Sequence, residues 1–215
     1  MTNFNALPRT FYEPSAEAVA PGLLGHWLVR KTPRGWCGGA IVETEAYLRN
    51  DAAAHSFRGE TPRNRIMFGA PGHVYVYFIY GNHWCVNAVC RPKGIAEAVL
   101  IRAVEPVFGV KFMEGRRPVT SPHELTNGPG KLCAAMDIDR ALNGADLCDE
   151  KSELFIARNP KQRTFLRASG PVIATTRIGI TQAAALPLRF YLEANPYVSR
   201  RVKRTVELVR PRMVR

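Results

Sequence analysis

The sequence lacks the features that mark membrane, secreted and disulfide-stabilised proteins. Its 215 residues contain no apolar run of the roughly 18 residues that a membrane span needs. The first nine residues have neither the basic region nor the apolar region of a secretory signal. The five cysteines are odd in number and include no Cys-x-x-Cys pair, which argues against a disulfide framework and against a zinc ribbon. We therefore expect a soluble, intracellular protein with free thiols and no membrane association.

Signatures of nucleotide and metal sites are missing as well. The stretch Gly128–Lys131 is not a nucleotide phosphate loop, because Leu125 stands where that loop needs its first glycine and Leu132 stands where it needs Ser or Thr. No dinucleotide-binding glycine pattern follows an apolar strand, and the five histidines show no His-x-x-x-His spacing. The sequence therefore predicts no metal and no cofactor.

Acidic residues are scarce relative to basic ones. The chain has 18 Asp and Glu against 30 Lys and Arg, 23 of them Arg, which gives a formal net charge of +12. This balance is typical of nucleic-acid binders, and planar guanidinium groups suit phosphate oxygens and base edges. An ordinary solvated positive surface is the alternative. The candidates for contact with a nucleic-acid backbone are Arg58, Arg63, Arg65 and, at a possible helix N-terminus, Lys131.

The apolar pattern predicts an α+β fold with a mainly antiparallel sheet, surrounding helices and a projecting β-hairpin. Strands are expected at 39–48, 74–80, 83–90 and 97–105, with a further pair within 153–192. Gly81-Asn82 suits a two-residue hairpin turn. Helices are expected within 15–30 and 128–142. We expect one compact domain over 1–199, followed by a basic C-terminal tail over 200–215 that contains Arg200, Arg201, Lys203 and Arg204.

Several polar and aromatic residues in the expected strands could carry chemistry. On the strand 39–48, Glu45 and Tyr47 lie on one face at a spacing of roughly 6–7 Å, so a carboxylate would stand beside an aromatic ring. Glu43 shares that face, and a solvated strand face is the simpler interpretation. Arg102, in the middle of an apolar strand, needs a carboxylate partner or a polar cleft. The same argument applies, with less force, to Asn87 in the expected strand 83–90.

The expected hairpin places Tyr80 at its exposed tip, where a large aromatic side chain contributes little to a core. On a basic protein it could be a wedge pushed between base pairs, or it could pack across the hairpin against His83. Strict alternation places Tyr77 on the opposite face, so both could serve one site only if the strand bulges or twists. His55, taken by itself, is more often structural than functional.

Eight runs along the chain resemble the alkyladenine DNA glycosylase family, also called the N3-methyladenine DNA glycosylases. They are Ile41–Leu48, Asp51–Ser56, Thr61–Arg65, Met67–Gly72, Tyr75–Gly81, Val99–Pro106, Leu125–Cys133 and Pro187–Tyr191. They occur in family-like order and spacing, and the resemblance extends over residues 7–199.

The resemblance implies a hydrolase of base excision repair that acts as a monomer on double-stranded DNA containing damaged purines. It would flip an alkylated or deaminated purine, such as N3-methyladenine or hypoxanthine, out of the duplex. It would then hydrolyse the N-glycosidic bond and leave an abasic site. By motif, Glu45 would be the general base and Arg102 would help hold the attacking water. None of the pocket residues is a lysine, so water attack fits better than a Schiff base.

The resemblance also assigns the recognition residues. Tyr47, His55 and Tyr77 would sandwich the flipped base, Asn87 would lie against its edge, and Tyr80 would fill the gap in the duplex. The chain departs from many relatives at Asn82, where they have a Met that supports the wedge. A non-catalytic damaged-DNA binding protein is one alternative, but it would not need Glu45 or Arg102. An RNA-binding domain is another, but single-stranded RNA leaves no gap for the hairpin wedge to fill.

Overall fold

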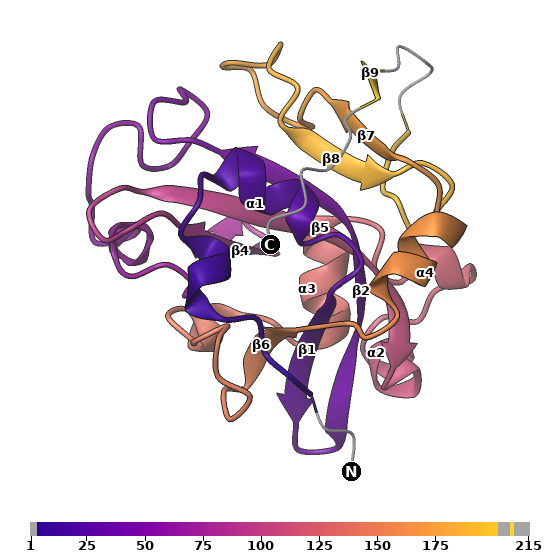
Figure 1. The fold of residues 1–215 in the computed structure, drawn as a ribbon. Coiled ribbons are helices and arrows are strands. Elements are labelled where there is room, and N and C mark those ends of the chain that lie inside the picture. Colours follow the sequence, from indigo (N-terminus) through magenta and orange to yellow (C-terminus); the bar gives the residue numbers. More distant parts are fainter. Residues whose placement is uncertain (1–3, 202–206, 209–215) are drawn as a thin grey trace.

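Runs of β-branched and aromatic residues form one antiparallel sheet, which curls around the interior of the molecule (Figure 1). The computed structural model describes residues 4–201 and the backbone of 207–208. Within that part, the strands are β1 (Trp27–Thr32), β2 (Gly35–Tyr47), β3 (Val74–Ile79), β4 (His83–Cys90), β5 (Glu97–Phe108), β6 (Leu154–Ala157), β7 (Val172–Thr175), β8 (Arg189–Leu192) and β9 (Glu207–Leu208). Their order is β3-β4-β5-β2-β8-β7-β9, and β1 pairs with both β2 and β6.

Short helices cover this sheet and complete the core. They are α1 (Ala16–Gly22), α2 (Val110–Arg116), α3 (Pro129–Met136) and α4 (Gln162–Ala168), with 3-10 turns η1 (Arg9–Tyr12), η2 (Arg65–Phe68), η3 (Pro122–Glu124) and η4 (Arg140–Leu142). The Ser15 hydroxyl accepts a hydrogen bond from the Ala18 amide and caps α1. Helix α1 packs on β2 and β5, and α3 packs on β4 and β5. Buried side chains of both helices and of these strands belong to one hydrophobic cluster.

The long strands β2 and β5 form the centre of the sheet and depend on two glycines. A Cβ atom on Gly39 would lie 1.9 Å from the carbonyl oxygen of Glu105, and one on Gly38 would lie 2.2 Å from that of Leu28. The register between β2 and β5 also shifts around Glu43, where the strand bulges. Residues 37–46 of β2 are buried.

The predicted α+β class is confirmed, as are the hairpin, the strand at 97–105 and the strand pair within 153–192, which is β7 with β8. The two-residue turn was a wrong prediction. Ile79 pairs with His83, so the turn has three residues, and both Tyr80 (φ 56°) and Gly81 (φ 73°) are left-handed. The Tyr80 side chain therefore leaves the alternation of β3, and it is 76% exposed.

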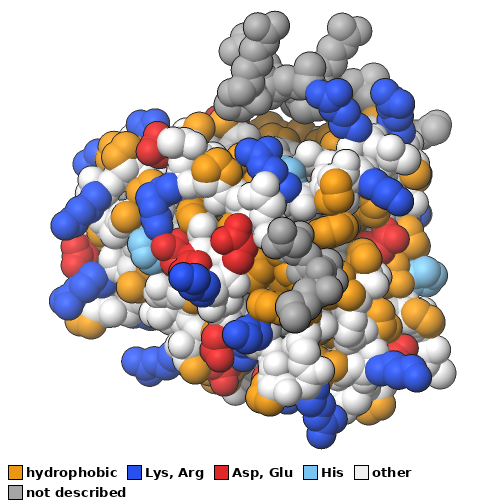
Figure 2. All heavy atoms as spheres, turned by 60° about the horizontal axis from the view of Figure 1, so that its bottom comes forward, with side chains coloured by type: hydrophobic (Ala, Val, Ile, Leu, Met, Phe, Trp, Pro, Cys, Tyr) orange, Lys and Arg blue, Asp and Glu red, His pale blue; other side chains and the backbone are white. Residues whose placement is uncertain are grey.

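The remaining expectations concern the surface and the ends. All five cysteines are free. No helix among the described residues is long and apolar enough to span a membrane. On the face shown in Figure 2, Lys and Arg side chains are spread over the surface with acidic side chains among them. Most of the predicted tail, including Lys203 and Arg204, lies outside the described residues, so the boundary at residue 199 remains a prediction.

Candidate active site

One pocket of about 250 Å³ lies between the β3–β4 hairpin, β5, the end of β2 and the start of α3. Six of the seven side chains predicted for catalysis, base binding and the wedge line it: Tyr47, His55, Tyr77, Tyr80, Asn87 and Arg102. The other walls include Leu100, Pro129 and the segment 178–180. The aromatic and apolar lining, with a few convergent polar groups, is what a site for a flat organic ring requires.

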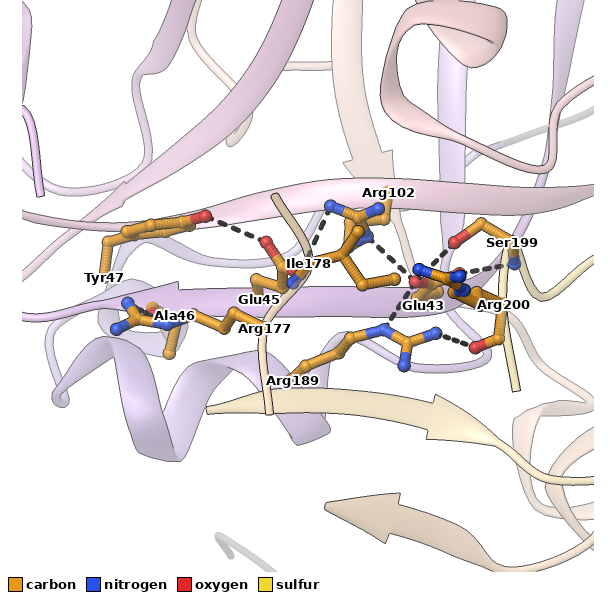
Figure 3. Close-up of polar contacts among 10 residues, drawn as sticks. All are labelled: Glu43, Glu45, Ala46, Tyr47, Arg102, Arg177, Ile178, Arg189, Ser199 and Arg200. Carbon is orange, nitrogen blue, oxygen red and sulfur yellow. Dashed lines mark hydrogen bonds and ion pairs between the residues drawn. The ribbon is translucent and has the colours of Figure 1, made fainter. Parts of the chain in front are cut away.

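The seventh residue, Glu45, lies beneath the pocket and is completely buried. Its carboxylate accepts hydrogen bonds from the Tyr47 hydroxyl at 2.9 Å and from the Ile178 amide at 2.8 Å, and it pairs with Arg102 Nη1 at 3.2 Å (Figure 3). All three partners line the pocket. The carboxylate is therefore held in a fixed orientation by three groups that border the cavity.

Glu43, which shares the strand face with Glu45, has different partners. It accepts from Arg102 Nε and Arg189 Nε, each at 2.8 Å, and from the amide and hydroxyl of Ser199 at 2.7 and 2.8 Å. Burial disfavours its charge, but the two guanidinium groups outweigh burial and lower its pKa below the usual value. Glu43 is thus a structural anion, and only Glu45 is placed beside the pocket.

Arg102 connects the two carboxylates, as Figure 3 shows. Its Nε binds Glu43 and its Nη1 binds Glu45. Burial alone would lower the pKa of Arg102, but the charges of Glu45 and Glu43 raise it above its usual value. The sequence predicted either a carboxylate partner or a polar cleft for this arginine, and the structure shows both, because Arg102 pairs with two carboxylates and lines the pocket.

The aromatic side chains form the walls of the pocket. The rings of His55 and Tyr77 meet edge to face, with centroids 4.4 Å apart. His55 Nδ1 lies 3.0 Å from the Tyr75 hydroxyl, and the Asn64 side chain donates to the His55 carbonyl oxygen at 2.8 Å. Desolvation of the ring, and then the charge of Arg63, lower the pKa of His55 below its usual value.

Tyr77 and Tyr80 line the same pocket, although strict alternation would separate them. The left-handed backbone of Tyr80 breaks the alternation of the strand, so both side chains can border one pocket. Burial raises the pKa of Tyr77, so its phenol remains protonated. The Asn87 amide donates to the Tyr75 carbonyl oxygen at 3.0 Å, which fixes the orientation of this side chain across the hairpin.

The predicted backbone-binding residues lie around this region with partners of their own. Arg63 donates to the Phe78 carbonyl oxygen at 3.1 Å, and its guanidinium lies 5.8 Å from the centre of the Tyr77 ring. Arg65 pairs with Glu60 at 3.2 Å, and Lys131 donates to the Asn127 side chain at 2.9 Å. Arg58 is exposed. Their contact with DNA remains a prediction.

Sequence reasoning missed several residues at this site. The amide of Ile178 donates to Glu45. The guanidinium of Arg177 lies over the ring of Tyr47. Arg189 pairs with Glu43. Arg189 lies in one of the runs that resemble the glycosylase family, but no spacing pattern links it to β2. Among residues 4–201, no group of three or more His, Cys, Asp and Glu side chains is arranged to hold a metal ion.

Comparison with known proteins gives a consistent result. The sequence profile of the methylpurine-DNA glycosylase family matches residues 10–196. A protein of Methanoculleus marisnigri is 51% identical over 195 residues, which are 91% of this chain and 99% of the relative. A relative from Carboxydothermus hydrogenoformans is 48% identical, and the match covers 91% of this chain and 99% of the relative. A relative from Rhodopseudomonas palustris is 47% identical, and the match covers 90% of this chain and 88% of the relative. All three are named "Putative 3-methyladenine DNA glycosylase".

Proposed function

This chain belongs to the methylpurine-DNA glycosylase family of hydrolases that act on N-glycosyl bonds, and we propose that it excises alkylated and deaminated purines by water attack. The substrates are purines such as N3-methyladenine and hypoxanthine in duplex DNA. The product is an abasic site, to be processed further in base excision repair. The enzyme acts inside the cell as a monomer, without a metal or another cofactor.

The observation that carries this proposal is the setting of Glu45. A buried carboxylate with three fixed donors lies next to a pocket lined by aromatic rings and Arg102. A general base needs a defined orientation and a position within reach of the water that it deprotonates. Glu43, whose four donors include two guanidinium groups, does not offer an equivalent position.

In the proposed reaction, Glu45 accepts a proton from a water molecule while the water oxygen bonds to the sugar C1′. The N-glycosidic bond breaks, and its electron pair leaves with the purine nitrogen. A cationic alkylated purine becomes neutral in this step, whereas a neutral purine such as hypoxanthine must also gain a proton. Arg102 holds the Glu45 carboxylate and the water in place. None of the side chains that line the pocket is a lysine, so the proposal has no Schiff-base intermediate.

The other pocket residues select the base. Tyr47, His55 and Tyr77 present rings against which a flipped purine stacks, and Asn87 lies against its edge. Tyr80, exposed at the hairpin tip, enters the duplex where the nucleotide has left it. The DNA backbone is contacted by four basic residues, Arg58, Arg63, Arg65 and Lys131. The last three have protein partners, which they must share or exchange when DNA binds.

The test is single-turnover release of base from a duplex that holds one hypoxanthine and, separately, from alkylated DNA. We expect the native protein to release free base and leave alkali-labile sites. Glu45→Gln keeps the size of the side chain but removes the base, so release should fall by about 100-fold or more while the variant still binds lesion duplex. Glu114→Gln, on the exposed side of α2, is the matched control and should behave as native.

The outcomes separate the alternatives. Release from alkylated DNA alone would retain the mechanism and narrow the substrate range. Tight binding of lesion duplex without release from either substrate would favour a non-catalytic damage-binding protein. Binding that prefers RNA to duplex DNA at matched salt would favour an RNA-binding domain. Release that is unchanged by Glu45→Gln would contradict the assigned role of Glu45.

A further inference from the structure

A buried ion pair, Arg177 with Asp51, lies behind one wall of the pocket. Both Arg177 Nη atoms contact the Asp51 carboxylate, with Nη2 3.0 Å from Oδ1, and the exposed fractions of the two side chains are 0% and 1%. Arg177 also donates to the carbonyl oxygens of Ala46, at 3.0 Å, and Ala183, at 3.3 Å. The mechanism outlined for Glu45 and Arg102 does not use this pair.

The guanidinium of Arg177 lies over the ring of Tyr47, with its central carbon 4.7 Å from the ring centre. Tyr47 lines the pocket, whereas Arg177 does not. The Tyr47 side chain therefore borders the cavity while the guanidinium covers one face of its ring. Figure 3 shows Arg177 against Tyr47 and Ala46. A cation held against an aromatic face is attracted to it.

The pair also connects the segments on either side of Tyr47. Asp51 Oδ1 accepts a hydrogen bond from the Ala53 amide at 3.0 Å, and Ala53 and His55 line the pocket. Arg177 directly precedes Ile178, whose amide donates to Glu45. A single ion pair thus joins the end of β2, the segment that carries His55 and the segment that orients the Glu45 carboxylate.

We propose that Arg177 and Asp51 are positioning residues for base excision, because they set the plane of the Tyr47 ring against which the flipped base stacks. The proposal rests on the proposed function. A buried pair of this kind is weak evidence for stability, since apolar residues often replace such pairs without loss, and a role in placing other groups accounts better for its presence. A small error in the placement of a reacting group lowers rates strongly.

The test uses Arg177→Lys, which keeps the charge but loses the planar two-pronged contact. Single-turnover rate constants, measured with enzyme in excess, do not depend on the folded fraction, so simple destabilisation would leave them unchanged. We expect the rate constant to fall about 10- to 100-fold. In a Tyr47→Leu background the same substitution should change the rate less than about 2-fold, because the group through which Arg177 acts is absent. The exposed Arg140→Lys is the control and should have no effect.

A readout independent of activity is the 19F resonance of Tyr47 in protein labelled with 3-fluorotyrosine. The chain has seven tyrosines, and loss of one resonance in Tyr47→Phe assigns it. We expect Arg177→Lys, and Asp51→Asn as a second variant, to shift or broaden the Tyr47 resonance and to leave that of Tyr80 in place. An unmoved Tyr47 resonance, or rate effects of Arg177→Lys and Tyr47→Leu that simply multiply, would overturn the proposal. A native protein that releases no base overturns the proposed function instead, and the resonance still decides whether the pair positions Tyr47.

Discussion

Glu43 and Glu45 lie two residues apart on β2, yet their partners give them opposite properties. Glu43 has two guanidinium groups and both polar groups of Ser199, and its pKa is lowered by these contacts. Glu45 has one guanidinium group, a phenol and a backbone amide, all of which border the pocket. At the scale of single residues, the partners of each carboxylate distinguish Glu43, held between two guanidinium groups, from Glu45, whose partners all border the pocket.

The structural role of Glu43 predicts a large loss of stability for Glu43→Gln. The substitution would leave Arg102 and Arg189 buried without their common anion, so the free energy of unfolding should fall by about 3–5 kcal/mol. Urea denaturation at pH 7 measures this change. The exposed Glu114→Gln should stay within about 0.5 kcal/mol of the native protein. A Glu43→Gln variant as stable as that control would show that the ion pairs contribute little.

At the scale of elements, the hairpin and helix α3 meet at a glycine. His83, the first residue of β4, packs against the start of α3, and a Cβ atom on Gly130 would lie 2.8 Å from its Cγ and 3.1 Å from its Cβ. Both residues line the pocket. The absence of a side chain at Gly130 therefore fixes how closely the hairpin that carries Tyr80 approaches α3.

Gly130→Ala tests this contact because helix propensity and packing predict opposite signs. Alanine in a helix is favoured over glycine by about 1 kcal/mol, but the clash with His83 should reverse this and lower stability by about 1–3 kcal/mol. Removal of the imidazole in Gly130→Ala/His83→Ala should restore much of the loss. Gly115→Ala on α2 is the matched control, since its added Cβ meets nothing within 4 Å, and it should be neutral or stabilising. A stabilising Gly130→Ala would contradict the close packing.

At the scale of the whole molecule, His26 joins three parts of the chain that are distant in sequence. Its ring meets that of Phe11 at 5.9 Å, and its Nδ1 lies 3.4 Å from the amide of Asn159, whose side chain donates to the Gly25 carbonyl oxygen at 2.9 Å. Burial lowers the pKa of His26 from 6.5 to about 4, so the folded protein holds this ring neutral.

This shift predicts that stability falls in mild acid. The unfolded chain binds a proton at His26 below about pH 6.5, whereas the folded protein does not until about pH 4. The contribution, on the order of 3 kcal/mol, is therefore present above pH 6.5 and is lost as the pH falls to 4. Urea midpoints between pH 4 and pH 7.5 should depend less on pH in His26→Gln than in the native protein. The exposed His123→Gln should keep the native dependence, and equal slopes in all three would refute the assignment.

The sequence by itself determined the class of fold and the family of the protein. Apolar alternation and turn residues are local signals, and they placed the hairpin, the central strands and the α+β class correctly. The charge of Arg102 in the apolar run of β5 was enough to predict a carboxylate partner or a polar cleft for this side chain, and it has both. The resemblance of the motifs agrees with the family profile over residues 10–196.

Only the tertiary structure decided which groups meet. Local spacing treats Glu43 and Glu45 alike, and their difference comes from Arg189, which is 146 residues from Glu43, and from Ile178, which is 133 residues from Glu45. Arg177 and Asp51 are 126 residues apart, and no periodic pattern connects them. Strand periodicity likewise separates Tyr77 from Tyr80, because it cannot encode the two left-handed residues of a three-residue turn. Periodicity records which side of an element is buried, whereas the partners of a buried charge depend on how distant segments pack.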